Sequence, residues 1–166
     1  DTGIEIIPET LIILAPKELQ KIISLEKFQE GIVGVPQSIK SLYAIALKIE
    51  KEFNDKGFPL VRVILPVQEL EQEQATIFFK VINGFIEKID LTKVPKKQIL
   101  RTYSYLKPLI NKKSLSLKEI ERRLLLASNS AGISLSSSLA AGTKEGGTRL
   151  VLEASHKLLS GGINFD

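Results

Sequence analysis

The sequence predicts an α+β protein made of two tandem β-α-α-β-β units, each a three-stranded sheet covered by two helices. A hydrophobic content of 43% with 25% charged residues is typical of a folded chain. Short apolar runs with strand-like composition alternate with segments of helical periodicity, and their order occurs twice along the 166 residues. The second unit follows the first at Gly84 with almost no linker, which predicts tandem packing.

The first copy begins with IEIIPETLIIL, where Pro8 predicts a short, irregular edge strand. APKELQKIISLEKF predicts a helix, because Leu19, Ile22 and Ile23 have helical spacing. A longer helix follows Ser38, a candidate cap, and ends before Gly57. Its predicted buried face comprises Ile39, Leu42, Tyr43, Ala46, Ile49 and Phe53. Two strands are predicted next, at 58–66 and 75–84.

The second copy repeats this order. FIEKIDL predicts a strand, and PKKQILRTYSYLKPLI predicts a helix that Pro108 must end or kink. The next helix begins after Ser116, with Glu119 three residues later as in a capping box, and stops at Gly132. ISLSSSLAA and TRLVLEA, separated by the turn TKEGG, predict the two closing strands.

Composition and charge exclude several functions. The chain has no Cys, and its single His, His156, is predicted to be a surface or linker residue, so we expect no metal, no cofactor and no catalytic triad. No pair of carboxylates has a catalytic pattern, so we predict that the chain is not an enzyme; EKEF and ELEQEQ are interpreted as solvated faces. Residues 1–85 carry a net charge of −3 and residues 86–166 a net charge of +7. The basic half indicates a solvated face, an acidic partner or an anionic membrane surface.

One stretch resembles a known family. GFPLVRVILPVQEL, a charged turn and FKVINGFIEKI resemble the first POTRA domain of two-partner-secretion transporters of the haemolysin secretion type, which are Gram-negative outer-membrane proteins. The family pattern is carried by Gly57, Phe58, Pro66, Gln68, Gly84, Phe85 and Ile86, and residues 115–142 are similar to its second POTRA domain. The sequence departs from the family at Pro8 and at EQEQA, where a turn Gly is usual.

The resemblance implies an organisation and a set of partners. It implies a POTRA domain at 1–84, a second at 85–156, and a run-in to a missing β-barrel at 157–166. The chain is then the periplasmic portion of an outer-membrane protein. Its implied partners are a secreted exoprotein, through the N-terminal secretion domain, and the chain's own C-terminal outer-membrane β-barrel.

The resemblance also implies a binding site. In POTRA domains the second strand lies at the sheet edge, where an extended client can add by β-augmentation. The implied partner-binding residues are Leu60, Val61, Arg62, Val63, Ile64 and Leu65 on this strand, Tyr43 on the neighbouring helix, and Ser134 and Ser136 on the equivalent strand of the second unit. The simpler alternative is that residues 60–65 form an ordinary half-buried core strand.

Other functions stay open at this point. The chain is either the capture module of an exoprotein transporter or the POTRA region of a general outer-membrane insertase or a division-type scaffold; a catalytic α+β domain is a third possibility, which lacks a nucleophile or metal set. GIVG at 31–34 lies between two helices, as the clamp of a KH nucleic-acid domain does. Apolar residues inside it and the acidic first half predict no nucleic-acid partner.

Overall fold

The structure is a computed structural model that describes residues 3–71 and 74–155. The chain forms two compact units. Unit 1 comprises the chain up to Lys56 together with Val61–Asn83, and unit 2 comprises Gly57–Leu60 together with the chain from Gly84 onward. The chain therefore leaves unit 1 after α2, contributes four residues to unit 2, and returns.

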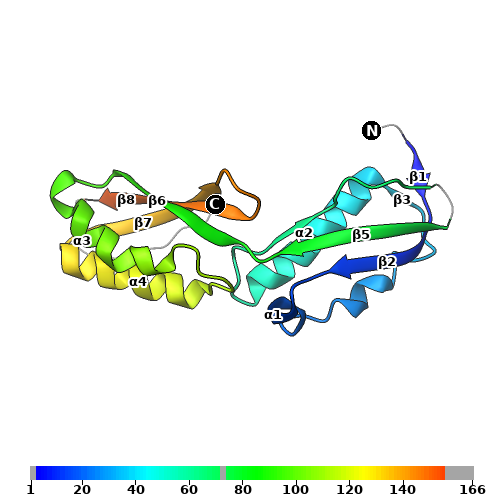
Figure 1. The fold of residues 1–166 in the computed structure, drawn as a ribbon, viewed down its shortest axis with the longest axis horizontal. Helices are drawn as coiled ribbons and strands as arrows, with labels where there is room; N and C mark the ends of the chain where they lie inside the picture. The colour runs from blue at the N-terminus through cyan, green and yellow to red at the C-terminus, as the bar shows by residue number, and fades with distance from the viewer. Residues whose placement is uncertain (1–2, 72–73, 156–166) are drawn as a thin grey trace. The chain divides into compact units, whose positions relative to one another are not determined.

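Unit 1 contains one three-stranded sheet and a separate short pair of strands. The sheet order is β2-β5-β4. The central β5 is parallel to β2 (Figure 1) and antiparallel to β4. The small pair joins β1 to β3 in antiparallel fashion. The elements are β1 (Glu5–Ile6), β2 (Pro8–Leu14), α1 (Lys17–Gln20), the 3₁₀ helix η1 (Glu26–Gln29), β3 (Gln37–Ser38), α2 (Ile39–Asp55), β4 (Arg62–Ile64) and β5 (Ala75–Ile82).

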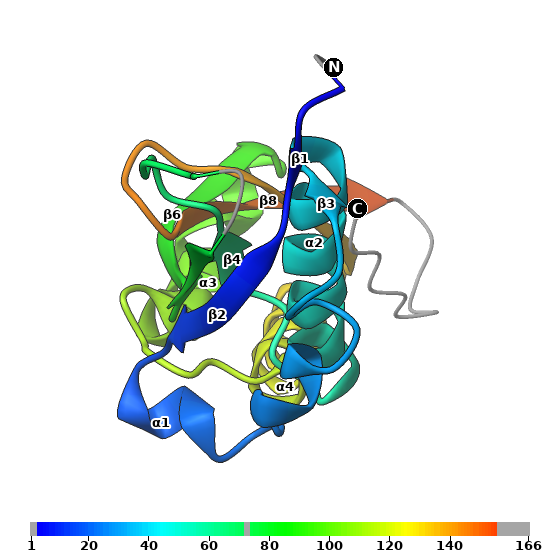
Figure 2. The same ribbon diagram turned by 90° about the vertical axis from the view of Figure 1, so that its right-hand side faces the viewer.

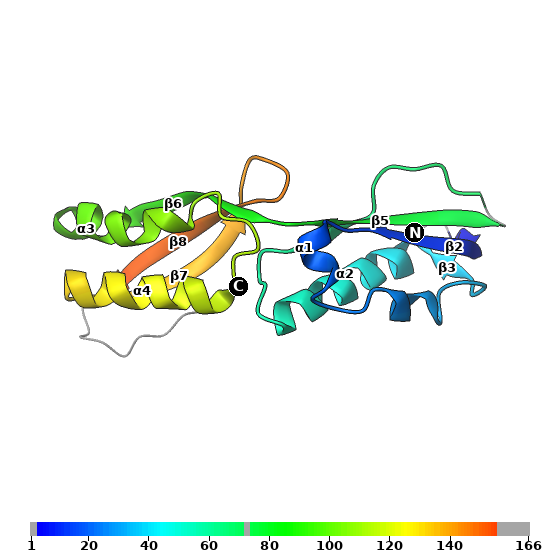
Figure 3. The ribbon, with the colours of Figure 1, turned by 60° about the horizontal axis from the view of Figure 1, so that its bottom comes forward.

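The core of unit 1 lies between α2 and one face of this sheet. Figures 2 and 3 show α2 running alongside the strands. On α2 the buried side chains are Leu42, Ala46, Ile49 and Phe53, and on β5 they are Ala75, Ile77, Phe79 and Val81. The predicted ends of this helix are confirmed: the Ser38 hydroxyl accepts a hydrogen bond from the Ser41 N–H, and Gly57 follows the helix with a φ of 94°.

Three predictions for unit 1 need correction. The predicted first helix is only a single turn, α1, and the residues after it form turns and η1. The strand predicted at 58–66 shrinks to Arg62–Ile64, since Pro59 and Pro66 bracket it and residues 57–60 belong to unit 2. On α2, Ile39 and Tyr43 are exposed rather than part of the buried face.

Unit 2 has the predicted β-α-α-β-β order. Its sheet order is β6-β8-β7, with β6 and β8 parallel and β7 and β8 antiparallel. Two helices lie side by side over one face of this sheet (Figure 3). The elements are β6 (Phe85–Lys93), α3 (Lys96–Leu106), the 3₁₀ helix η2 (Lys107–Leu109), α4 (Leu117–Ala131), β7 (Ser134–Ala141) and β8 (Gly147–Ser155).

The helix ends of unit 2 follow the sequence signals. The α-helical part of α3 stops at Leu106, just before the short 3₁₀ turn that contains Pro108. The Ser116 hydroxyl accepts a hydrogen bond from the Glu119 N–H at 3.2 Å, as half of a capping box. Gly132 ends α4 in the left-handed conformation.

The core of unit 2 includes a residue from the segment between α2 and β4. Leu60 is buried among the apolar side chains of β6, α4 and β8, which include Ile86, Leu124 and Leu150. Gly57 fixes the start of the same segment, because its carbonyl oxygen accepts a hydrogen bond from the Leu117 N–H at 2.8 Å. The predicted division between residues 84 and 85 places this segment in the first domain, and that division into two POTRA domains stays a prediction.

Gly84 is required where Leu60 passes it. A Cβ built on Gly84 would lie 1.9 Å from the Leu60 carbonyl oxygen, a distance that no side chain can accommodate without moving the backbone. This glycine of the family pattern therefore has a packing reason within unit 2.

Within the described residues no helix has the length and apolar character to cross a membrane. His156 and the expected run-in at 157–166 lie outside the described residues.

Candidate partner-binding site

Strand β4 lies at one edge of the unit 1 sheet, as the resemblance implied. Arg62 and Ile64 pair with Ile82 and Lys80 of β5, so their backbone groups point into the sheet. Backbone groups alternate in direction along a strand, and the Val63 N–H accordingly points away from β5. The outer margin of β4 is thus the side to which an extended partner would add.

The structure shows that this margin is not bare. The Val63 N–H donates a hydrogen bond to Oε2 of Glu50, on α2, at 3.1 Å. The Arg62 guanidinium donates through Nη1 to Oε1 of the same carboxylate at 3.5 Å and to the Val61 carbonyl oxygen at 3.4 Å. Two charged side chains therefore occupy backbone groups on the outer margin of β4. The interpretation of EKEF as a solvated face is wrong for Glu50, because this side chain binds the edge strand; no pattern in the sequence distinguishes it from a carboxylate that contacts only water.

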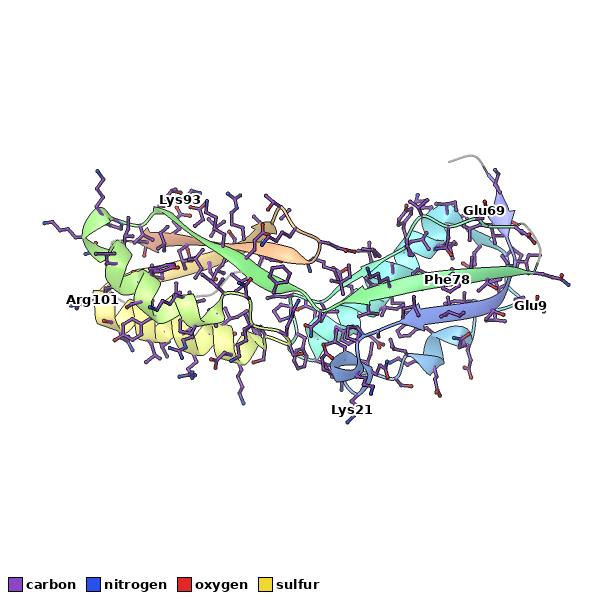
Figure 4. The ribbon with its side chains drawn as sticks, in the orientation of Figure 1. Glu9, Lys21, Glu69, Phe78, Lys93 and Arg101 are labelled. Atoms are coloured by element: carbon purple, nitrogen blue, oxygen red, sulfur yellow. The ribbon has the colours of Figure 1, made fainter. Side chains whose placement is uncertain are left out.

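Gln68 replaces a missing strand residue beyond β4. Its side-chain amide donates to the Phe78 carbonyl oxygen at 3.0 Å and accepts from the Phe78 N–H at 2.9 Å. Phe78 lies on β5 (Figure 4), two residues before Lys80. A longer β4 would pair Phe78 with Pro66, which has no N–H. The Pro-x-Gln pattern of the sequence therefore ends the backbone ladder and completes it with a side chain.

An exposed apolar stripe on α2 lies next to this margin. It consists of Ile39, Tyr43 and Leu47, spaced four residues apart, and Leu47 is 64% exposed. Glu50 follows Leu47 by three residues and Tyr43 by seven, so it lies on the same helix face. Since Glu50 reaches the Val63 N–H, this face adjoins the outer margin of β4. Tyr43 and Val63 are therefore placed along one surface, as the resemblance implied.

The six predicted strand residues have different environments. Only Arg62, Val63 and Ile64 form the strand. Val61 is buried in unit 1 and Leu65 is half-buried outside the strand. Leu60 is buried in the core of unit 2, so its side chain is not accessible to a partner.

Strand β7 lies at an edge of the unit 2 sheet, and it is longer than β4. All eight of its residues pair with β8, from Ser134 with Ser155 to Ala141 with Thr148. Leu135 and Ser137 are buried toward the helices, and Ser134 and Ser136 are half-buried on the other face. The serines of this strand thus alternate between the two faces of the sheet, and the edge itself consists of backbone groups.

A carboxylate holds the turn between β7 and β8. Glu87 lies in a β-bulge of β6 and accepts hydrogen bonds from the Thr143 N–H, from the Thr143 hydroxyl and from the Lys144 N–H. The Thr143 N–H contributes most to holding the pKa of Glu87 below its usual value, and this outweighs partial burial, which raises the pKa. The sequence contains no local signal for this contact, because it joins residues more than fifty positions apart.

Comparisons with known proteins agree with the fold. CdiB from Escherichia coli aligns with 93% of this chain at a TM-score of 0.61 and 16% identity, and CdiB from Acinetobacter baumannii aligns with 93% at 0.57 and 15%. POTRA domains 1–3 of the periplasmic domain of Omp85 from Anabaena align with 90% at 0.55 and 13% identity.

The chain covers 28% and 30% of the two CdiB chains and 65% of the Omp85 chain. No family model and no curated protein sequence matches the chain. At these identities the likeness concerns the fold alone. This chain has the fold of tandem POTRA domains, as its sequence motifs predicted.

Proposed function

We propose that this chain is the periplasmic capture module of an outer-membrane protein transporter, which binds a secreted exoprotein and delivers it to a β-barrel in the same polypeptide. The observation that carries the proposal is the outer margin of β4, beside the apolar stripe of α2. An extended client that adds there gains backbone hydrogen bonds from Val63 and places side chains against Tyr43 and Leu47. The likeness in fold to CdiB and to the periplasmic domain of Omp85 supports this proposal.

Backbone pairing suits a client that arrives unfolded. Pairing along a strand edge depends little on the client's sequence, whereas the apolar stripe favours clients with large apolar residues at alternate positions. β7 is the second proposed docking edge, through the backbone groups around Ser134 and Ser136. In this role the chain binds and orients its client and performs no chemistry.

A POTRA region of a general outer-membrane insertase or a division-type scaffold is the alternative function, and the likeness in fold to Omp85 favours it. The two functions differ in their client. A dedicated transporter binds the N-terminal secretion domain of one exoprotein, whereas an insertase region binds many barrel precursors.

Replacing Val63 by Pro tests the binding edge. Pro removes the outward N–H of Val63 and no hydrogen bond of the β4–β5 ladder, and proline is tolerated on edge strands. Val63→Ala is the matched control, because it truncates the same side chain and keeps the N–H. Titration with the N-terminal secretion domain of the proposed exoprotein client should give about fivefold weaker binding for the Pro variant than for the Ala variant, which corresponds to about one net hydrogen bond.

Equal affinities of the two variants would rule out strand addition at β4. Binding of the secretion domain no tighter than that of unrelated barrel precursors would favour the insertase alternative.

A further inference from the structure

The carboxylate of Glu50 occupies the place that a partner's backbone would take on β4. Its Oε2 lies 3.1 Å from the Val63 nitrogen, which is the distance of an ordinary inter-strand N–H···O=C bond. The other oxygen faces the Arg62 guanidinium, which also reaches the Val61 carbonyl oxygen. A strand that adds to β4 must therefore replace Glu50 at Val63 before it can pair there.

The geometry also allows this replacement at low cost. The ion pair with Arg62 keeps a partner for the carboxylate after the Val63 N–H is released. The Glu50 side chain is about one quarter exposed and that of Arg62 is 40% exposed, so water can solvate both during the exchange. The displaced carboxylate is thus never left buried without a partner, which is the situation that would make its release expensive.

We infer that Glu50 is a displaceable cap on β4, which keeps the edge closed to chance partners and yields its place to the backbone carbonyl of a client strand. Charged side chains on edge strands are a common protection against edge-to-edge association. Glu50 differs from a charge that merely points outward, because it is hydrogen-bonded to the strand's own outward N–H. The cap therefore sets the affinity of the site, and a client must contribute enough contacts along α2 to open it.

This inference rests on the proposed function for the identity of the client, but the capping role can be measured without that client. The chain is tested in full length with a short, end-blocked peptide of alternating Val and Thr, which forms strands and carries no charge. The variants are Glu50→Ala, which removes the cap, and Glu50→Gln, which keeps an acceptor oxygen but loses the ion pair.

Glu52→Ala is the matched control. Glu52 lies two residues farther along α2 and pairs with Lys27 at 2.7 Å, away from β4. Its loss removes one carboxylate and one ion pair from unit 1 without opening the strand. The double variant Glu50→Ala/Val63→Pro removes both the cap and the N–H that it covers.

We expect Glu50→Ala to bind the peptide about fivefold more tightly than the unmodified chain, which corresponds to release of about one net hydrogen bond. The peptide affinity of Glu50→Gln should lie between those of Glu50→Ala and the unmodified chain. Glu52→Ala should bind the peptide as the unmodified chain does, and the double variant should not bind it more tightly. Equal affinity of Glu50→Ala and the unmodified chain would overturn the inference, and so would a gain that survives Val63→Pro. Should Glu50→Ala fail to fold, the peptide affinity of Glu50→Gln is compared with that of the unmodified chain instead, and equal affinities would overturn the inference.

Association between copies provides a second measurement. The chain contains no Cys, so Val67→Cys, at a fully exposed side chain just beyond β4, introduces a single thiol. Disulfide formation between copies should be faster when Glu50→Ala is added, because two open β4 edges pair with each other. A thiol at Leu100, exposed on α3, reports collisions that do not involve β4 and should show no such gain. A gain of the same size at Leu100 would contradict edge pairing.

The outcomes separate the cap from the proposed function. If the exoprotein domain binds Val63→Pro and Val63→Ala equally while Glu50→Ala still binds the peptide more tightly than the unmodified chain, the cap stands and the client assignment fails. If Val63→Pro weakens binding of the exoprotein domain, while the domain and the peptide each bind Glu50→Ala and the unmodified chain equally, capture at β4 stands and the cap fails.

Discussion

At the scale of single residues, side chains form hydrogen bonds with backbone groups that have no partner strand. Gln68 supplies both a donor and an acceptor to Phe78, as a backbone residue of a longer strand would. Glu50 and Arg62 cover groups of the outer margin of β4, and Glu87 gathers the amides of the β7–β8 turn. These contacts explain why a short strand and a glycine-rich turn are well defined in this fold.

Gln68→Ala tests the first of these contacts. The variant leaves the Phe78 N–H and carbonyl without their partner, so we expect the free energy of unfolding to fall by about 1–3 kcal/mol. Urea denaturation followed by circular dichroism measures the change. Gln74→Ala, at an exposed site six residues later, provides a comparison in the same connection. Equal stability of Gln68→Ala and the unmodified chain would show that water replaces the amide at no cost.

Glu87 makes the stability of the β7–β8 turn depend on pH. Its pKa is lower in the folded chain than in the unfolded chain, chiefly because of the Thr143 N–H, so folding favours the ionised form. The stabilisation is complete above the unfolded pKa of about 4.3 and is lost as the pH falls through the lower folded pKa. The unmodified chain should therefore exceed Glu87→Gln in stability at neutral pH, and this difference should shrink in acid. A difference that stays constant from neutral pH to pH of about 3 would contradict this account.

At the scale of elements, the sequence predicts the type and order of most strands and helices but not all of their lengths. α2, α4 and their caps follow from periodicity together with Ser38, Ser116 and Gly132, because these signals are local. The length of β4 and the shortness of α1 depend on where residues 57–60 and the apolar residues after α1 are buried. Such long-range packing leaves no periodic signal in the sequence.

The candidate site, too, could be predicted from the sequence only in part. The edge position of β4 could be inferred from the family pattern, and β4 does lie at the edge. A partner-binding role for Tyr43 stays a prediction. The contact of Glu50 could not be inferred, because a carboxylate on a helix surface has the same sequence pattern whether it contacts water or a neighbouring strand. The predicted buried face of α2 includes Ile39 and Tyr43, which are exposed together with Leu47; the buried face lies one position away on the helix.

The turn that enters β5 provides a test at this scale. Gln74 has a φ of 55° and lies in the stretch EQEQA, where a turn glycine is usual in the family; this left-handed conformation costs a residue with a Cβ about 1–2 kcal/mol. Gln74→Gly removes that cost and adds some unfolded-state entropy, so we expect a net stabilisation of about 0.5–1 kcal/mol. The midpoint of thermal unfolding should rise. A lower midpoint would mean that Gln74 contributes contacts worth more than its strain.

At the scale of the whole molecule, the chain passes from one unit to the other more than once. The chain enters unit 2 at Gly57, leaves it after Leu60 and enters it again at Gly84. Leu60 and Val61 are neighbours in sequence, yet Leu60 is buried in unit 2 and Val61 in unit 1. Adjacent substitutions should therefore weaken different units.

Leu60→Ala and Val61→Ala form a matched pair. We expect Leu60→Ala to cost about 2–5 kcal/mol, because it leaves a cavity in the hydrophobic core of unit 2, and to speed amide exchange in unit 2. Val61→Ala should speed exchange in unit 1 instead. Hydrogen exchange read by mass spectrometry resolves the two patterns. Faster exchange in unit 1 alone for Leu60→Ala would contradict the assignment of Gly57–Leu60 to unit 2.

The central claim is that an extended client adds to the outer margin of β4. The most direct measurement is hydrogen exchange across the full chain, with and without the secretion domain of the exoprotein. We predict that exchange slows at residues 61–65 and along α2 near Tyr43, and that Val63→Pro abolishes the protection at 61–65. Protection confined to other surfaces, with residues 61–65 unchanged at saturating client, would contradict the claim.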